Sequence, residues 1–227
     1  MKESEVAEVS LPKWPAVIVV GKPVTKEQAA EIIVRTCSGY VHTNDRDFAR
    51  RAYSVLGVTM TEHYGYSYIH ADYESVRQVK RELRILDLEY CNNYRIASSW
   101  IGGPHGWVNW DGAVGCTSYN IGKWPSASTV LGEWKKIAQA FPYLDLTCQL
   151  WSGEVGEEGA KPVIQFRVKN GKVTTHRPKA PIAAPDDSAA DTFVARLLST
   201  GDGERGCTIE QLTEAVAITR KAIKEHQ

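Results

Sequence analysis

The sequence lacks three features that would each have indicated a particular class of protein. It has no excess of charge, because 27 lysines and arginines stand against 27 aspartates and glutamates. It has no run that approaches the roughly 18 apolar residues of a membrane-spanning helix. It has no CxxC pair among its five cysteines. These absences argue against binding along a nucleic-acid backbone, against a membrane protein and against a structural zinc site.

The cysteines and the first residues indicate the compartment. The five cysteines are scattered and odd in number, which is typical of free thiols in a reducing cytoplasm. Residues 1–13 are polar and charged and lack the apolar core of a signal peptide. We therefore expect a cytoplasmic protein that carries no metal and no cofactor. Its 227 residues suit one large domain, or one domain with an appendage.

A buried strand and a capped helix open the predicted fold. Residues 14–20 are a short, β-branched apolar run, which is typical of a buried strand. Thr25 and Gln28 have the spacing of a capping box, in which each side chain satisfies a backbone N–H at the start of a helix. Apolar residues at helical spacing then predict an amphipathic helix over 26–37.

Two more helices are predicted before the middle of the chain. A turn-rich link over 39–45 precedes a helix that ends at Gly57. Residues 58–71 alternate imperfectly, which predicts an irregular strand or an aromatic-rich connection. Asp72 is expected to cap a helix that continues to Leu86.

The middle of the chain is predicted to form an antiparallel sheet. Residues 88–100 look extended, and the Asp111-Gly112 pair between aromatic residues predicts a hairpin turn. Helical spacing predicts a helix over 126–141, and alternation predicts a strand over 144–151. The Asn-Gly pair within 169–172 predicts a second hairpin. Strands joined by hairpins form antiparallel sheets, and a helix covers the apolar face.

The C-terminal part is predicted to be helical. Residues 178–188 contain three prolines and are expected to be a linker. The fold class is therefore α+β: an antiparallel sheet covered by helices, with an N-terminal strand–helix segment and a C-terminal helical pair. The expected parts are a flexible lead (1–13), an α+β domain (14–177), the linker, and the helical pair (189–227), which docks on the domain or on a partner subunit.

The stretch from Trp100 to Trp124 is the candidate binding site. It holds four of the seven tryptophans together with six glycines, and polar side chains lie among them. Aromatic rings can stack on a base or a sugar, and ligand pockets combine apolar walls with a few polar groups. We expect the protein to bind a polar aromatic, nucleotide-like small molecule. The candidate ligand-binding residues are Trp100, His105, Trp107, Asn109, Trp110, Asp111, Ser118, Tyr119, Asn120, Lys123 and Trp124.

Other interpretations of this stretch stay open. The tryptophans can instead fill the core of the sheet, with the glycines only making turns. His105 with Cys116 or Asp111 could serve a hydrolase or transferase, although no nucleophile-elbow signature accompanies them and a half-buried cysteine is favoured. A tryptophan-rich surface also suits a protein-interaction inhibitor, an assembly module or a homo-oligomer.

Two groups of charged residues are weaker candidates for a site. Asp145, Glu154, Glu157 and Glu158 could bind a divalent cation, but a solvated acidic loop is favoured because the spacing of an EF-hand is missing. The basic residues of the helix that follows Asp72 could bind phosphates. Glutamates on the same helix favour an exposed face of mixed charge instead.

Two parts of the sequence resemble known groups of proteins. With GGPHGWVNWDGAVGCTSYNIGKWPS followed by LGEWKKIAQAFPYLDLTCQLW, most of residues 12–175 resembles a family of proteins carried by tailed bacteriophages and some actinobacteria. The family brings no reaction that could be carried over, so no residue inherits a role. It implies a phage protein, for which sequestering a nucleotide-like signal of host defence would be a sensible role. The segment 121–150 is also similar to small ferredoxin-like domains of mobile elements, which concerns the fold alone.

Overall fold

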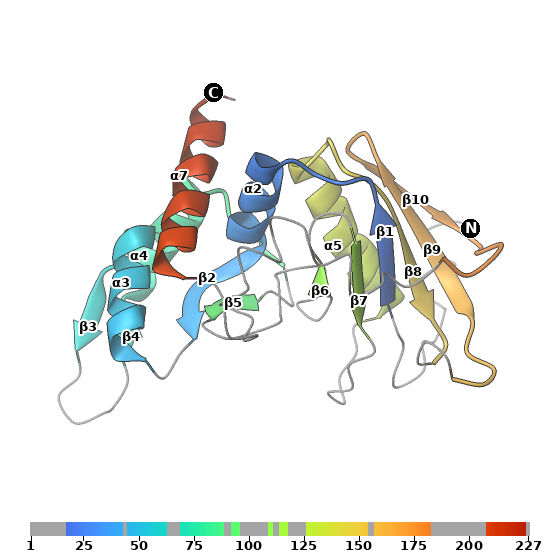
Figure 1. Cartoon of the computed structure of the whole chain (residues 1–227), viewed down its shortest axis with the longest axis horizontal. Coiled ribbons are helices and arrows are strands. Elements are labelled where there is room, and N and C mark those ends of the chain that lie inside the picture. The colour runs from blue at the N-terminus through green and yellow to red at the C-terminus, as the bar shows by residue number, and fades with distance from the viewer. Residues whose placement is uncertain are drawn as a thin grey trace. The chain divides into compact units, whose positions relative to one another are not determined.

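The computed structural model describes residues 17–42, 45–62, 69–88, 92–95, 109–110, 114–117, 126–153, 157–182 and 208–225. The chain forms two compact units (Figure 1). Unit 1 comprises Met1–Val24 and Gly103–Ala190, and unit 2 comprises Thr25–Gly102 and Asp191–Gln227. The sequence instead predicted one continuous domain over 14–177. Each unit combines helices with strands, so the α+β class is confirmed.

Unit 1 is built on a six-stranded antiparallel sheet of order β10-β9-β8-β1-β7-β6 (Figure 1). Its strands are β1 (Val17–Gly21), β6 (Asn109–Trp110), β7 (Val114–Thr117), β8 (Asp145–Trp151), β9 (Pro162–Lys169) and β10 (Lys172–His176). The hairpins predicted around Asp111-Gly112 and Asn170-Gly171 are both present, as the antiparallel pairs β6–β7 and β9–β10. The second turns through Asn170 and Gly171, whose φ angles of 51° and 72° are those of a type I′ turn.

The order of the central strands is that of a ferredoxin-like element. Strand β1 lies between β7 and β8 and runs antiparallel to both, so that β7 and β8 are parallel to each other. Helix α5 (Ala127–Ala140) connects them, which makes a split β–α–β unit. Along the chain, the first segment of unit 2 stands between β1 and β6, where a ferredoxin-like fold has a single crossover helix.

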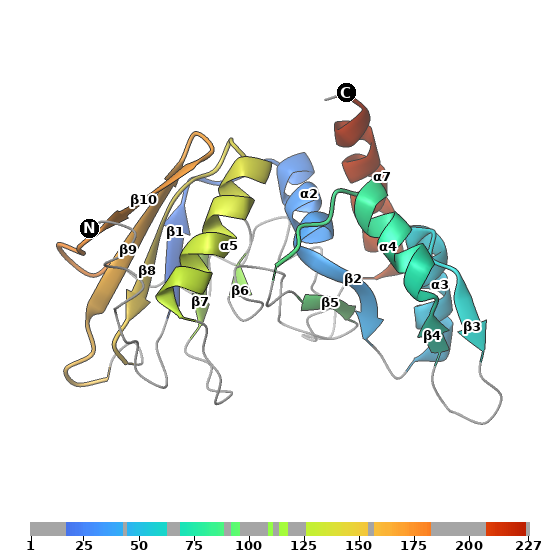
Figure 2. The same ribbon diagram turned by 180° about the vertical axis from the view of Figure 1, so that it is seen from behind.

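Alternation along the strands decides which face of the unit 1 sheet is buried. Helix α5 crosses one face (Figure 2), and the strand residues that point to it are 0–1% exposed. They are Val17, Val19, Leu146, Cys148, Leu150, Ile164, Phe166 and Val168. Helix α5 begins as predicted, because the Ser126 hydroxyl accepts a hydrogen bond from the backbone N–H of Thr129 at 3.1 Å. Trp134 and Phe141 fill the space between helix and sheet.

Unit 2 combines four helices with two small sheets in the part of the chain that the structure describes. The helices are α2 (Lys26–Thr36), α3 (Arg46–Leu56), α4 (Tyr73–Glu82) and α7 (Ile209–Glu225). Strands β2 (Cys37–His42) and β5 (Asn92–Arg95) pair in parallel, and β3 (Met60–Glu62) pairs antiparallel with β4 (Ile69–Ala71). Helix α7 packs against α2 and α3. Its partner in the predicted helical pair falls in 183–207, outside the described residues.

Local hydrogen bonds define the helix starts of unit 2, and those of α2 and α4 confirm the predicted caps at Thr25 and Asp72. The capping box of Thr25 and Gln28 is formed in full, and Asp45 and Asp72 accept hydrogen bonds at the starts of α3 and α4. Thr208 and Gln211 form the reciprocal pair at the start of α7, with distances of 2.8 and 3.2 Å. None of the helices in the described ranges combines the length and the apolar character that crossing a bilayer requires.

Two predictions for unit 2 were wrong in detail. The predicted link 39–45 is mostly strand β2. Its parallel partner β5 lies some 50 residues further along the chain, so the local sequence pattern did not indicate this pairing. Helix α4 ends at Glu82 rather than Leu86. Arg84 there takes a left-handed conformation with φ of 48°, and its carbonyl accepts a hydrogen bond from Nε of the buried Arg35 at 3.1 Å.

Candidate functional site

The face of the unit 1 sheet opposite α5 carries polar side chains in register. Neighbouring residues on paired strands point to the same face, so these side chains form rows across β8 and β9. Strand β10 extends all three rows, with Lys172 beside Lys169, Thr174 beside Arg167 and His176 beside Gln165. The rows on β8 and β9 are Asp145 with Lys169, Thr147 with Arg167, and Gln149 with Gln165.

One end of this face is covered by the chain itself. The Gln149 side chain is fully buried, and its Nε2 donates to the carbonyl of Ala180 at 2.8 Å and to Oε1 of Gln165 at 2.9 Å. Its Oε1 accepts from the backbone N–H of Ile182 at 3.0 Å. One glutamine therefore holds the segment 180–182 across the sheet. Ile182 packs on the apolar cluster around Ile18 at this end.

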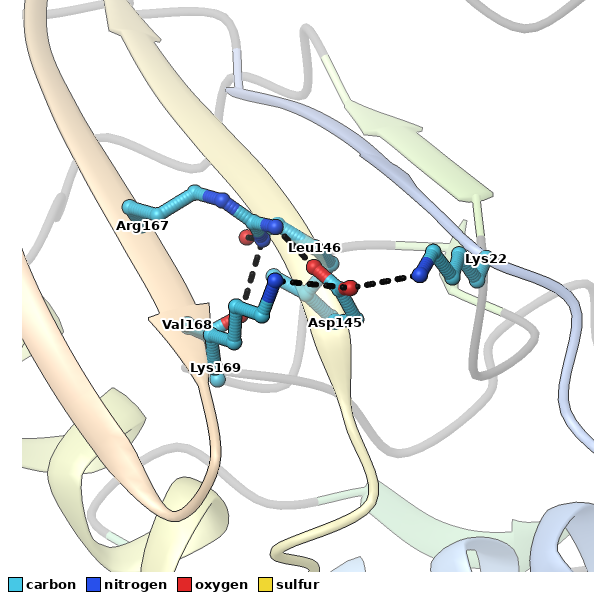
Figure 3. Close-up of polar contacts among 6 residues, drawn as sticks. All are labelled: Lys22, Asp145, Leu146, Arg167, Val168 and Lys169. Carbon is cyan, nitrogen blue, oxygen red and sulfur yellow. Dashed lines mark hydrogen bonds and ion pairs between the residues drawn. The ribbon is translucent and has the colours of Figure 1, made fainter.

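The other end of the same face carries an ion cluster, which we call the Asp145 cluster: Lys22, Asp145, Arg167 and Lys169. Asp145 Oδ2 lies 2.9 Å from Nζ of Lys22 and 3.7 Å from Nζ of Lys169. Asp145 Oδ1 contacts Nη2 of Arg167. The side chains come from β8, β9 and the residue after β1, and they converge on the single carboxylate (Figure 3). Three cations therefore share one anion.

The cations of the Asp145 cluster differ in how firmly they are held. Arg167 is 32% exposed, and its Nη1 donates to the carbonyls of Leu146 at 2.7 Å and Val168 at 2.9 Å. Lys22 and Lys169 are 77% and 55% exposed. Exposed ion pairs typically contribute about 0.2–1 kcal/mol to stability. The arginine is fixed to the sheet, whereas the two lysines keep donors that face solvent.

Unit 1 as a whole is close to neutral, with 12 lysines and arginines against 11 aspartates and glutamates, so its excess of cations is local. The described residues of unit 1 include nine lysines and arginines and four acidic residues. Two of the acids are engaged or buried, since Asp145 is in the cluster and Glu133 of α5 is 3% exposed. Glu157 and Glu158 are exposed in the loop between β8 and β9. The unit therefore shares the charge balance of the whole sequence, and the cations gather locally at the Asp145 cluster.

Asp145 lies apart from the acidic loop residues with which the sequence groups it as a candidate cation ligand. It begins β8, within the predicted strand 144–151, and its carboxylate is surrounded by cations. Glu154 lies outside the described residues. Within the described ranges, no group of three histidine, cysteine or acidic side chains is placed to hold a metal ion.

The predicted ligand-binding stretch is described only at its two strands. Asn109 pairs with Cys116, which in turn pairs with Ile18 of β1, and Trp110 pairs with Gly115. The hairpin expected around Asp111-Gly112 is therefore present, with the turn itself in 111–113, outside the described residues. The other candidate residues also lie outside the described part of the chain: Trp100, His105, Trp107, Ser118, Tyr119, Asn120, Lys123 and Trp124.

The strand register brings this hairpin to the Asp145 cluster. Strand β6 ends at Trp110 and β7 begins at Val114, which pairs with Val20 of β1. Lys22 follows two residues after Val20, and its backbone N–H donates to the carbonyl of Asp145 at 3.0 Å. The ends of β6 and β7 at Trp110 and Val114 therefore lie at the same end of the sheet as the Asp145 cluster, although Trp110 is in line with Gly115 and Val19, which belong to the face that α5 covers. Strands β7 and β8 are separated only by β1, which corresponds to about 10 Å.

Sequence reasoning did not single out Lys22, Arg167 or Lys169. Alternation along β9 predicts that Arg167 and Lys169 share a face, but it does not reveal that Asp145 and Lys22 join them. The thiol chemistry is also clearer in the structure. Cys148 is a fully buried free thiol, and burial raises its pKa to about 12, which disfavours the thiolate form.

Comparison with protein-family models, curated proteins and solved structures finds no match for this chain. Its function is therefore inferred from the sheet and the contacts described above.

Proposed function

We propose that unit 1 binds a small, anionic, nucleotide-like molecule at the end of its sheet formed by the Asp145 cluster and the tip of the β6–β7 hairpin. One observation supports this proposal above the others. The register places the end of β6 and the cationic side chains of Lys22 and Lys169 at the same end of the sheet. Trp110 is in line with Gly115 and Val19 of the α5 face and the lysines lie on the opposite face, so the ligand would extend across this end of the sheet.

The chemistry of the two neighbours is complementary in a nucleotide-like ligand. Such a ligand has a flat base, a polar sugar and an anionic group. Stacking of a base on an aromatic side chain is worth about 1–3 kcal/mol, and the hairpin belongs to a stretch that contains four tryptophans. The lysines supply the charge that an anionic group requires.

The extent of the basic surface favours a small ligand over a polymer. A protein that follows a nucleic-acid backbone neutralises many phosphates with many basic residues. Here three cations gather at one point, and a carboxylate already offsets part of their charge. The arrangement suits one or two phosphoryl groups. The resemblance to phage proteins extends the proposal to a protein that sequesters a nucleotide-like signal of host defence in the cytoplasm.

The test is mass spectrometry of small molecules released when the purified protein is denatured. We expect a compound with a base-like chromophore from the wild-type chain. The double variant Trp107→Ala/Trp110→Ala should lose it, whereas Trp107→Phe/Trp110→Phe should retain much of it because the rings remain. Equal retention by the alanine and wild-type proteins, both folded by circular dichroism, would remove the hairpin from the site.

A further inference from the structure

We infer that Lys22 and Lys169 form a phosphoryl-binding subsite, in which Asp145 serves as the internal counter-ion that the ligand replaces. The inference rests on the proposed function and specifies it. The ligand would carry a phosphate or diphosphate group, which binds at the Asp145 cluster, while the rest of the molecule extends toward the β6–β7 hairpin.

The geometry of the two lysines suits one polyatomic anion. Both ammonium groups approach the same oxygen, Asp145 Oδ2, at 2.9 and 3.7 Å. They reach it from different strands, Lys22 from the end of β1 and Lys169 from the end of β9, as Figure 3 shows. A tetrahedral group with several oxygens can therefore contact both ammonium groups at once, from the side that solvent reaches.

The charge of the cluster favours a multiply charged anion. The three cations that contact Asp145 leave two positive charges beyond that carboxylate, and Lys172, the exposed register partner of Lys169 on β10, adds another beside them. A phosphate monoester carries about −1.5 to −2 charges at pH 7. A phosphoryl group therefore neutralises more of this surface than a carboxylate with a single charge does.

The different contacts of the arginine and of the two lysines also favour a phosphate ligand over a carboxylate ligand. A planar carboxylate is best recognised by the fork of an arginine. The fork of Arg167 is already engaged by Asp145 and by the carbonyls of Leu146 and Val168. The two groups that remain available are ammonium ions, which act as mobile point charges and bind phosphate without a planar requirement. Arg167 is therefore a positioning residue that holds Asp145 in place.

The frame that presents the lysines is rigid. The backbone N–H of Lys22 donates to the carbonyl of Asp145, and Lys169 is the register partner of Asp145 on β9. The three Cα atoms are thus fixed by hydrogen bonds between adjacent strands. The ligand needs to order only the two lysine side chains.

The test is isothermal titration calorimetry on the full chain with inorganic pyrophosphate, ADP, adenosine and citrate. The key variant is Lys22→Gln/Lys169→Gln, which removes both charges and keeps similar side-chain lengths. The matched control is Lys161→Gln, because Lys161 is an exposed lysine of unit 1 that precedes β9, at the end of that strand away from Lys169. Thermal unfolding of each variant confirms that it folds.

We expect the double variant to bind pyrophosphate and ADP at least tenfold more weakly, and the Lys161→Gln protein to stay within twofold of the wild type. Asp145→Asn should bind pyrophosphate more tightly than the wild type, since the internal competitor is removed. A purely structural ion cluster would not produce this gain. Unchanged affinity in the double variant, or no binding of pyrophosphate by the wild type, would overturn the phosphoryl subsite.

The panel separates this inference from the proposed function. If adenosine binds the wild type and the double variant equally while pyrophosphate does not bind, the small-molecule site stands and the phosphoryl subsite falls. If pyrophosphate binding depends on the two lysines and ADP binds no more tightly than pyrophosphate, the phosphoryl subsite is supported. A contribution of the aromatic hairpin to affinity is then contradicted. Citrate binding equal to that of pyrophosphate would show that the cluster does not select phosphate, and would overturn the assignment.

Discussion

The two units of the chain use charged residues in different ways. In the described part of unit 2, thirteen lysines and arginines face twelve acidic residues, and the ion pairs join one cation to one anion. Unit 1 is also close to neutral over its full sequence, with 12 basic and 11 acidic residues, but three of its cations share the single carboxylate of Asp145. A neutral chain can therefore contain a locally basic surface, and the total charge does not exclude an anion site.

The best-buried arginine shows the contrast most clearly. Arg35 of unit 2 is 9% exposed, pairs with Glu31 one turn earlier on α2, and donates to the carbonyl of Arg84. The backbone N–H of Leu86 returns a hydrogen bond to the carbonyl of Arg35 at 2.7 Å. Arg35 thus ties the end of α4 to α2, which is a structural role. The lysines of the Asp145 cluster are instead more than half exposed and contact Asp145 from two different strands.

The largest effect is expected from Arg35→Met in unit 2. The change leaves the carboxylate of Glu31 and the carbonyl of Arg84 without their buried donor, which should cost about 3 kcal/mol of unfolding free energy. Urea unfolding followed by circular dichroism measures it. The matched control is Arg77→Met, whose exposed pair with Glu74 should contribute less than about 0.5 kcal/mol. Equal effects of the two changes would contradict the structural role of Arg35.

Gln149→Ala should give the next largest effect, in unit 1. The backbone groups of Ala180 and Ile182 would lose a buried partner, which typically costs about 1–3 kcal/mol. Hydrogen exchange should also show faster exchange of the Ile182 amide, while the amides of β9 and β10 stay protected. If the Ile182 amide keeps its protection in the variant, Gln149 does not hold this segment.

A smaller effect is expected from Asp145→Asn, and it sharpens the comparison of the units. Three cations would lose their shared counter-ion, so the variant should be destabilised by about 1 kcal/mol at low salt. Added salt screens the repulsion and should remove most of the difference. Glu74→Gln in unit 2 removes an exposed one-to-one pair and should have no measurable salt-dependent effect. A loss at Asp145 that does not respond to salt would indicate packing rather than charge.

The smallest change should be a gain, from Arg84→Gly. A non-glycine residue with φ of 48° is strained, and glycine adopts this conformation freely. Part of the benefit is offset by the greater freedom of glycine in the unfolded chain. We expect about 0.5–1 kcal/mol of stabilisation by urea unfolding. Arg84→Ala, which keeps the strain but removes the side chain, should not stabilise.

Local signals explain why much of the fold could be predicted from the sequence. Four helices begin at a residue whose side chain accepts a hydrogen bond from a backbone N–H three residues later: Thr25, Asp72, Ser126 and Thr208. Because both partners are close in the sequence, such a cap can be recognised from the sequence alone. The turn at Asn170-Gly171 is equally local, because both residues tolerate positive φ angles.

Non-local pairing explains what could not be predicted. The parallel pairing of β2 with β5 and the order of the six strands depend on partners far apart in the chain. The Asp145 cluster has the same character, since Lys22 lies more than a hundred residues before Asp145 and meets it only because β1 pairs with β8. The aromatic stretch was visible because its composition is unusual, whereas isolated lysines carry no such signal.

The most direct test of ligand binding at the Asp145 cluster is a titration of the isotope-labelled protein with ADP, followed by backbone amide chemical shifts. We predict that the largest shifts occur at Lys22, Asp145 and Lys169, together with Trp110 and Val114 at the tip of the hairpin, and that the amides of α3 and α7 in unit 2 stay unchanged. Shifts confined to unit 2, or no shifts in unit 1 at millimolar ADP, would contradict a site at this end of the sheet.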